Sequence, residues 1–105
     1  MDKVAYFPTD RAQHYVKSLC QHFSRRVEAR WTDTEGWVQF PFGRCDMQAS
    51  ASGLNLTASA TDAAGLGQVV EVVTSHLDRY AFRENPQLDW RALPAPGRQF
   101  EQTKD

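Results

Sequence analysis

Hydrophobic residues recur with two different periods along this 105-residue chain. Over residues 12–23 they return every three or four positions, which is the spacing of an amphipathic helix. The six residues of this stripe are Ala12, Tyr15, Val16, Leu19, Cys20 and Phe23. Thr9 stands where a helix cap is expected, and Asp10 would lie in the first turn near the positive helix end. A second stripe of the same period spans residues 66–81, with a Thr-Asp pair at 61–62 to cap it.

Between the two helices the period changes to two, which is typical of half-buried strands. Four such segments follow one another with short turns between them, at residues 27–33, 37–42, 44–50 and 54–60. Short connections between consecutive strands predict an antiparallel meander. Pro41 cannot donate a backbone hydrogen bond, so it indicates a strand end, a bulge or an edge. A further strand, residues 3–8, precedes the first helix.

The predicted order of elements is therefore β-α-β-β-β-β-α, an α+β fold. We expect a curved antiparallel sheet with both helices on one face, similar to the TATA-binding-protein-like (helix-grip) topology. This topology by itself carries no evidence of DNA binding. A single domain is expected over residues 1–90, in which the segment 87–90 docks through Trp90 as its anchor. Residues 91–105 are polar and rich in proline, and we expect them to form a loose tail.

Charge and composition narrow the classes of function. The formal net charge is -1, whereas a nucleic-acid-binding domain would carry a clear basic excess, so we expect no nucleic-acid partner. No segment reaches the roughly 20 apolar residues of a membrane span, and no signal-peptide-like run opens the chain. A cytoplasmic location without a membrane partner is expected. Arginine outnumbers lysine nine to three; its planar guanidinium suits carboxylates and phosphates, although a GC-rich genome would give the same bias.

One place in the predicted fold could form a binding site, where the two helices lie next to each other. His22 and His76 each lie to the same rotational side of their own hydrophobic stripe. Four antiparallel strands between the helices make them run in opposite directions, so these flanks either face each other or both face solvent. The candidate ligand-binding residues on the two flanks are Tyr15, His22, Arg26, His76, Tyr80 and Arg83. Facing each other, they could bind a carboxylate, a phosphate or a phenolate.

The alternative for each histidine is a half-exposed position with no ligand. No metal site is predicted, because Cys20 and His22 are two residues apart on a helix and point in nearly opposite directions. Cys20 and Cys45 are expected to be small apolar core residues. Asp78 and Glu84 are expected to pair with neighbouring arginines. No cofactor is predicted, and no nucleophile with a base at readable spacing indicates an enzyme.

Three stretches resemble a bacterial family known as domain of unknown function 2218, and these are YVKSLCQHFSRRVEARW (15–31), FPFGRCDM (40–47) and VVEVVTSHLDRYAFRENPQLDW (69–90). The run HLDRYAFRE matches the family pattern with Tyr80 in place of a phenylalanine. Arg25 stands where the family often has a second histidine, which argues further against a metal there. The resemblance implies no established activity. Some members carry a dihydroxyheptenedioate aldolase label, but that chemistry belongs to a (β/α)8 barrel of about 250 residues.

Two hypotheses of function remain ahead of a third. The first is a non-enzymatic binding module that holds a small anionic ligand between its helices. The resemblance links it to iron or siderophore handling, because other members occur beside or fused to siderophore-related reductases. The second is a protein-interaction or oligomerisation domain, a homodimer for example, formed through the uncovered sheet face or an apolar patch at Trp37 and Pro41. A small enzyme of unknown reaction ranks third.

Overall fold

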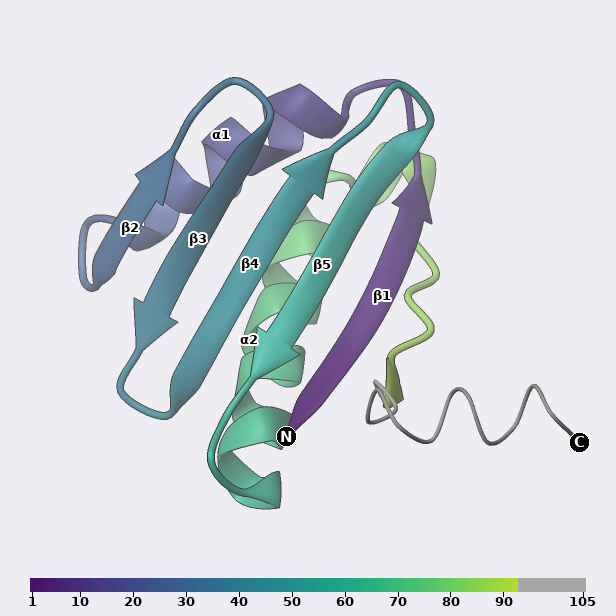
Figure 1. Cartoon of the computed structure of the whole chain (residues 1–105). Coiled ribbons are helices and arrows are strands. Elements are labelled where there is room, and N and C mark those ends of the chain that lie inside the picture. The colour runs from purple at the N-terminus through teal and green to yellow at the C-terminus, as the bar shows by residue number, and fades with distance from the viewer. Residues whose placement is uncertain (93–105) are drawn as a thin grey trace, which may run out of the picture.

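The computed structural model describes residues 1–92 and shows an open six-stranded antiparallel sheet with two helices on one face (Figure 1). Its elements are β1 (Asp2–Pro8), α1 (Ala12–Phe23), β2 (Glu28–Trp31), β3 (Glu35–Phe40), β4 (Gly43–Ala49), β5 (Gly53–Ser59), α2 (Ala63–Tyr80), the short 3-10 helix η1 (Phe82–Glu84) and β6 (Arg91–Ala92). The strand order in the sheet is β2-β3-β4-β5-β1-β6. The predicted α+β class is confirmed, and the predicted succession of strands and helices is confirmed as far as α2, after which η1 and β6 were not predicted.

The first strand lies next to the last strand of the meander. β1 pairs with β5 over its whole length, from Asp2 opposite Ser59 to Pro8 opposite Gly53. β2 to β5 form the predicted meander, in which every neighbouring pair is antiparallel. Pro41 follows β3 directly, so this strand ends where proline removes the backbone donor.

The core lies between the sheet and the two helices. All six residues of the first predicted stripe are buried in α1. Inward-facing residues alternate along the strands, for example Val38 and Phe40 in β3. α1 approaches β3 so closely that a Cβ atom at Gly36 would lie 2.7 Å from Cys20 Sγ, so a side chain at this position would collide with the helix. Cys20 and Cys45 are free and buried, as predicted.

The two helices begin in different ways. α2 begins with Asp62 as its N-cap, and the Gly65 N–H donates to the Asp62 carboxylate at 2.7 Å. The predicted Thr9 cap of α1 is wrong, because Arg11 is the N-cap residue and makes no side-chain cap. The Thr9 hydroxyl instead accepts from the Arg11 N–H at 3.1 Å and donates to Glu84 at 2.7 Å. Thr9 therefore links β1 to the end of the α2 region rather than starting the next helix.

The chain after η1 runs back beside β1, at the edge of the sheet (Figure 1). Trp90 packs against the core, and its indole N–H donates to the Thr74 hydroxyl at 2.9 Å. β6, at the start of the predicted tail, pairs with β1. Residues 93–105, the rest of that tail, lie outside the described residues. Within residues 1–92, no helix is long and apolar enough to cross a bilayer.

Candidate functional site

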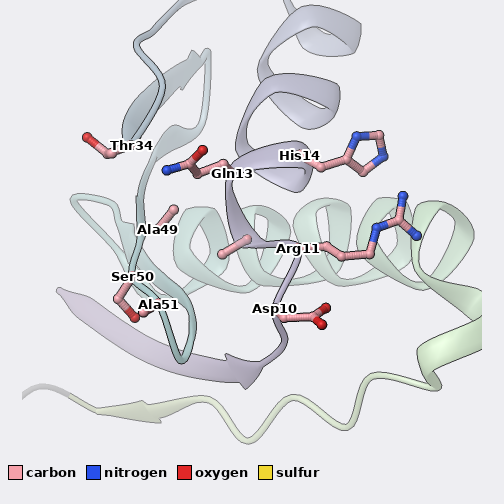
Figure 2. Close-up of a pocket in the computed structure, with 9 residues that line it drawn as sticks. Asp10, Arg11, Gln13, His14, Thr34, Ala49, Ser50 and Ala51 are labelled. Carbon is pink, nitrogen blue, oxygen red and sulfur yellow. The ribbon is translucent and has the colours of Figure 1, made fainter.

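His22 and His76 lie beside each other where α1 ends and α2 passes it. Their ring centroids are 4.9 Å apart and the ring planes are inclined by 46°. Both side chains are half-buried. Of the two arrangements that the sequence left open, facing each other or both facing solvent, the structure has the first. The helix axes cross, as the purple α1 and teal α2 in Figure 2 show, so α1 meets α2 over only a short stretch of each.

Three more rings extend the histidine pair into a cluster that reaches the sheet. Phe23, the last residue of α1, lies with its ring centroid 4.7 Å from that of His76 and 5.1 Å from that of Phe40. Tyr80, the last residue of α2, lies 5.8 Å from His22 in an edge-to-face arrangement. Tilted and edge-to-face pairs are arrangements that aromatic rings prefer. This ring cluster therefore fixes the end of α1 to both α2 and the sheet.

A groove of about 430 Å³ opens next to the ring cluster. This histidine groove is lined by His22, Phe23, Arg25, Arg26, Val27, Phe40 and His76. Phe23 and Phe40 are almost fully buried and form an apolar floor with Val27, whereas Arg25 and Arg26 are exposed and lie at the rim. Every charged residue in the lining is basic. The groove is therefore apolar below and cationic above, a combination that suits small organic anions.

The surroundings of the two histidines determine their protonation. His76 Nδ1 lies 2.7 Å from the Val72 carbonyl oxygen, which can only accept, so Nδ1 carries a proton. The other nitrogen, Nε2, is left to accept when the ring is neutral and to donate when it is protonated. Burial lowers the pKa of His22 below its ordinary value. Four nearby basic groups lower this pKa further, and these are His76, Arg25, Arg79 and Arg26. His22 is therefore neutral near pH 7, and the positive potential comes from the arginines.

The chemistry of the groove fits an anion better than a metal ion. Among residues 1–92, no group of three or more His, Cys, Asp or Glu side chains is arranged to hold a metal. The arginines near His22 would also repel a cation. Guanidinium groups and protonated imidazole nitrogens bind oxyanions through charge-assisted hydrogen bonds. None of the residues that line the groove carries a hydroxyl or thiol, so this lining contains no Ser, Thr or Cys nucleophile.

Tyr15 is not part of the histidine groove. Its side chain is 1% exposed, and its hydroxyl donates to one carboxylate oxygen of Glu84 while Thr9 donates to the other. These three residues form the Glu84 bridge, which ties η1 to the segment around the start of α1. The expected pairing of Glu84 with a neighbouring arginine is wrong, because its two oxygens accept from these two hydroxyls. No sequence signal indicated this contact, since Tyr15 and Glu84 are 69 residues apart.

The Glu84 bridge shifts the ionisation of both of its strongest partners. Burial, followed by the hydrogen bond to Glu84 and the charge of that carboxylate, raises the pKa of Tyr15 to about 12. The hydrogen bonds from Tyr15 and Thr9 hold the pKa of Glu84 below its usual value. At neutral pH the bridge is therefore a carboxylate that accepts from two protonated hydroxyls.

The six candidate residues fall into three groups. Three belong to the ring cluster, and these are His22, His76 and Tyr80. Arg26 lies at the rim of the groove. Tyr15 belongs to the Glu84 bridge, and Arg83 lies outside the groove lining, with its guanidinium carbon 5.7 Å from the ring centroid of Phe82. The structure thus brings together the candidates at the end of α1 and on the facing part of α2, and it places Tyr15 and Arg83 elsewhere.

Sequence reasoning missed four residues of the groove, and these are Phe23, Arg25, Val27 and Phe40. The hydrophobic pattern places Phe23 and Phe40 in the core, where they indeed lie. Both are the last residues of their elements, α1 and β3. A buried ring at the end of a helix or strand can keep one edge open to a cavity. A phenylalanine at the predicted end of an element was therefore the sequence feature that could have indicated the groove.

A larger hollow of about 680 Å³ lies at the other end of α1 (Figure 2). The start of α1, the end of β4 and the turns before β3 and after β4 line it, with Ala49 from β4 and Thr34, Ser50 and Ala51 from the turns. Gln13 extends towards Thr34, whereas Arg11 and His14 project from the other side of the helix in Figure 2. Asp10, Arg11 and His14 also belong to the lining, so this hollow has acidic as well as basic side chains, whereas every charged residue of the histidine groove is basic.

Comparisons with known proteins agree with the fold and add no activity. The model of a bacterial family, described as uncharacterized protein conserved in bacteria (DUF2218), matches residues 4–91. The NMR structure of PA4090 from Pseudomonas aeruginosa is similar to this chain, with a TM-score of 0.76 and 24% sequence identity. The similarity covers 90% of this chain and 98% of that one. At this identity the likeness concerns the fold alone. A comparison with curated proteins finds no match.

Proposed function

The chain belongs to the bacterial DUF2218 family of uncharacterized proteins, and from this starting point we propose that it is a non-enzymatic module that binds a small anion in the histidine groove. The family description names no activity, so the proposal rests on the groove itself. The observation that carries it is a cationic rim, Arg25 and Arg26, above an apolar floor, with no acidic residue in the lining.

The charge around the groove supports an anion as the occupant. Burial is the main cause of the lowered pKa of His22, and its basic neighbours lower this pKa further, so their charges add a positive potential at this ring. A bound carboxylate or phosphate would offset that potential and accept charge-assisted hydrogen bonds from Arg25 and Arg26. A partly enclosed site strengthens such contacts because fewer water molecules compete with them.

Iron or siderophore handling is a narrower form of this proposal. The support for it is the family resemblance, through members found beside siderophore-related reductases. A ferric siderophore presents anionic oxygen donors, so it would meet the same rim as a simple anion. It is therefore one of the ligands to try.

The test is a titration of the uniformly 15N-labelled protein with inorganic phosphate near pH 7, followed by backbone and imidazole chemical shifts. Saturable shifts at His22, His76 and their neighbours are expected. The double variant Arg25→Gln/Arg26→Gln should weaken phosphate binding about tenfold, the loss of one good charge-assisted contact. The matched control, Lys17→Gln/Arg30→Gln, removes the same charge from exposed positions outside the groove lining. It should change the affinity less than about twofold.

Two results would contradict the proposal. Equal losses in the two double variants would mean that phosphate responds to net charge and not to the groove. No saturable shift at the groove with phosphate, acetate or a ferric siderophore would remove anion binding altogether.

The alternative of an interaction domain built on Trp37 and Pro41 finds less support. The Arg44 guanidinium carbon lies 4.5 Å from the centroid of the Trp37 ring, and Arg44 also pairs with Asp46 at 3.0 Å. The indole is therefore partly covered by charged neighbours, which is unfavourable for a self-associating apolar patch. Sedimentation that shows a concentration-dependent dimer would favour this alternative, and a monomer at all concentrations would remove the homodimer.

A further inference from the structure

We infer that the anion bound in the histidine groove is aromatic, a planar ring that bears a carboxylate or a phosphate group. This inference rests on the proposed anion binding and narrows the class of ligand. In the bound state the ring lies on the apolar floor, and the oxyanion lies at the rim beside Arg25 and Arg26.

The size of the groove argues against a bare inorganic anion as its natural occupant. The groove measures about 430 Å³, which lies within the range of pockets that enclose organic ligands, roughly 300 to 1,000 Å³. Phosphate or acetate would occupy only the rim and leave the floor in contact with water. A ligand with an apolar body removes that floor from water and gains free energy in proportion to the area buried.

The rings around the floor favour a flat body over a flexible one. Phe23 is inclined by 53° to His76 and by 87° to Phe40, so neighbouring rings present both edges and faces. A planar ring can therefore make an edge-to-face contact with one of them and an offset stack with another. An aliphatic acid of equal size would lose rotational freedom on binding and would gain none of these ring contacts.

The order of groups from floor to rim fixes the orientation of the ligand. Phe23 and Phe40 are 7% and 5% exposed, whereas both rim arginines are exposed. An anionic group at the rim keeps part of its hydration while it meets two guanidinium groups, which avoids the cost of a fully buried charge. The reverse orientation would place the charge against the phenyl rings and is strongly disfavoured.

Matched pairs of probes separate the ring from the charge. The pairs are benzoate with acetate and phenyl phosphate with inorganic phosphate, and hexanoate serves as a flexible acid of similar size. In each pair we expect the ring-bearing member to bind about tenfold tighter or more, the gain from removing one ring face from water. Hexanoate should bind less tightly than benzoate. The measurement is an NMR titration, with nuclear Overhauser contacts from the ligand ring protons to Phe23, Val27 and Phe40.

A conservative change in the floor provides the control within the protein. Val27→Thr keeps the shape of the side chain and puts a hydroxyl on the floor, so it should weaken benzoate about threefold or more and leave acetate unchanged. Val4→Thr makes the same chemical change at a half-buried position in β1, outside the groove lining. It should leave both affinities unchanged.

Each other outcome overturns one identifiable claim. Acetate and inorganic phosphate that bind in the groove as tightly as their ring-bearing partners would overturn the aromatic ligand and leave anion binding intact. Hexanoate as tight as benzoate, or equal losses in Val27→Thr and Val4→Thr, would overturn the ring requirement. Ring contacts to residues outside the groove would overturn the site. If no probe perturbs the groove, the proposed function itself fails.

Discussion

The Glu84 bridge and the histidine groove lie towards the two ends of α1, and each joins that helix to α2 or to η1 directly after it. In the bridge one carboxylate accepts from the hydroxyls of Tyr15 and Thr9, and the Tyr15 side chain is fully buried. In the groove two half-buried imidazoles lie among arginines, and no carboxylate belongs to the lining. At one end of α1 the polar groups of the bridge are paired with one another, whereas at the other end the basic groups of the groove have no carboxylate partner in the lining.

This difference separates a structural contact from a site. A buried donor without an acceptor costs free energy, so the Tyr15 hydroxyl needs Glu84 and leaves nothing over for a ligand. The histidines and arginines of the groove are partly open to water, so they can retain spare hydrogen-bonding capacity without that cost. The Glu84 bridge should therefore govern stability, and the histidine groove should govern binding. Mutations that remove groups from each region test this distinction.

Glu84→Ala should have the largest effect. It leaves the Tyr15 hydroxyl buried without its acceptor, and we expect the free energy of unfolding to fall by about 2 to 3 kcal/mol. Urea unfolding followed by circular dichroism measures this loss. Asp78→Ala removes an equal charge from an exposed position of α2 and should cost less than about 0.5 kcal/mol. Similar stabilities of the two variants would show that the Glu84 bridge does not stabilise the fold. The affinity for phosphate should be equal in both variants, because neither residue lines the groove.

The sequence predicted what depends on local periodicity. The stripe in α1 and the alternation in β3 to β5 gave the elements and most of the core, because burial of one helix face or one strand face leaves a regular pattern. The same reasoning placed His22 and His76 on flanks of the same hand. It could not choose between facing inward and facing outward, because periodicity does not say on which side of a helix its neighbour packs.

What the sequence could not predict depends on contacts between distant segments. The Glu84 bridge joins residues 69 positions apart, and it requires η1 to turn back over the start of α1. The Thr9 prediction failed for a local reason instead, because α1 begins at Ala12 and the Thr9 oxygen accepts from the N–H of Arg11, the residue before the helix. The groove floor likewise combines the ends of α1 and β3, and only the packing of helix on sheet brings them together.

Tyr15→Phe should have an intermediate effect that depends on pH. The pKa of Tyr15 rises from 10.0 in the unfolded reference to about 12 in the folded protein, so the folded state holds this proton more tightly. The resulting stability is complete below pH 10 and is lost as the pH rises through about 12. Tyr15→Phe should be about 1 kcal/mol less stable near pH 7. It should also lack the loss of stability at alkaline pH that ionisation of Tyr15 causes in the parent protein.

Urea unfolding at a series of pH values between 7 and 12, with tyrosinate absorption recorded in parallel, checks the behaviour of Tyr15. Tyr6→Phe is the matched control, because Tyr6 is 42% exposed and its hydroxyl bonds to Ser52 on the surface. That variant should keep the alkaline loss of the parent protein. An unchanged alkaline loss in Tyr15→Phe would mean that the bridge does not hold the phenol proton.

His22→Gln should have the smallest effect on stability, and the effect should appear on the acid side. The pKa of His22 is lowered from 6.5 in the folded protein, so the unfolded chain takes up the proton first and stability falls as the pH drops below 6.5. His22→Gln should reduce this fall in melting temperature between about pH 7.5 and 5.5, whereas His14→Gln, at an exposed position of α1, should not. Equal slopes in the two variants would contradict the assignment.

Phosphate adds a second criterion, because an anion in the groove favours the protonated ring and stabilises the folded state. We therefore expect phosphate to reduce the fall in melting temperature at acidic pH in the parent protein, and to reduce it less in His22→Gln. This result would show that the proton on His22 and the anion occupy the same groove, whose lining contains no carboxylate to take the place of the anion.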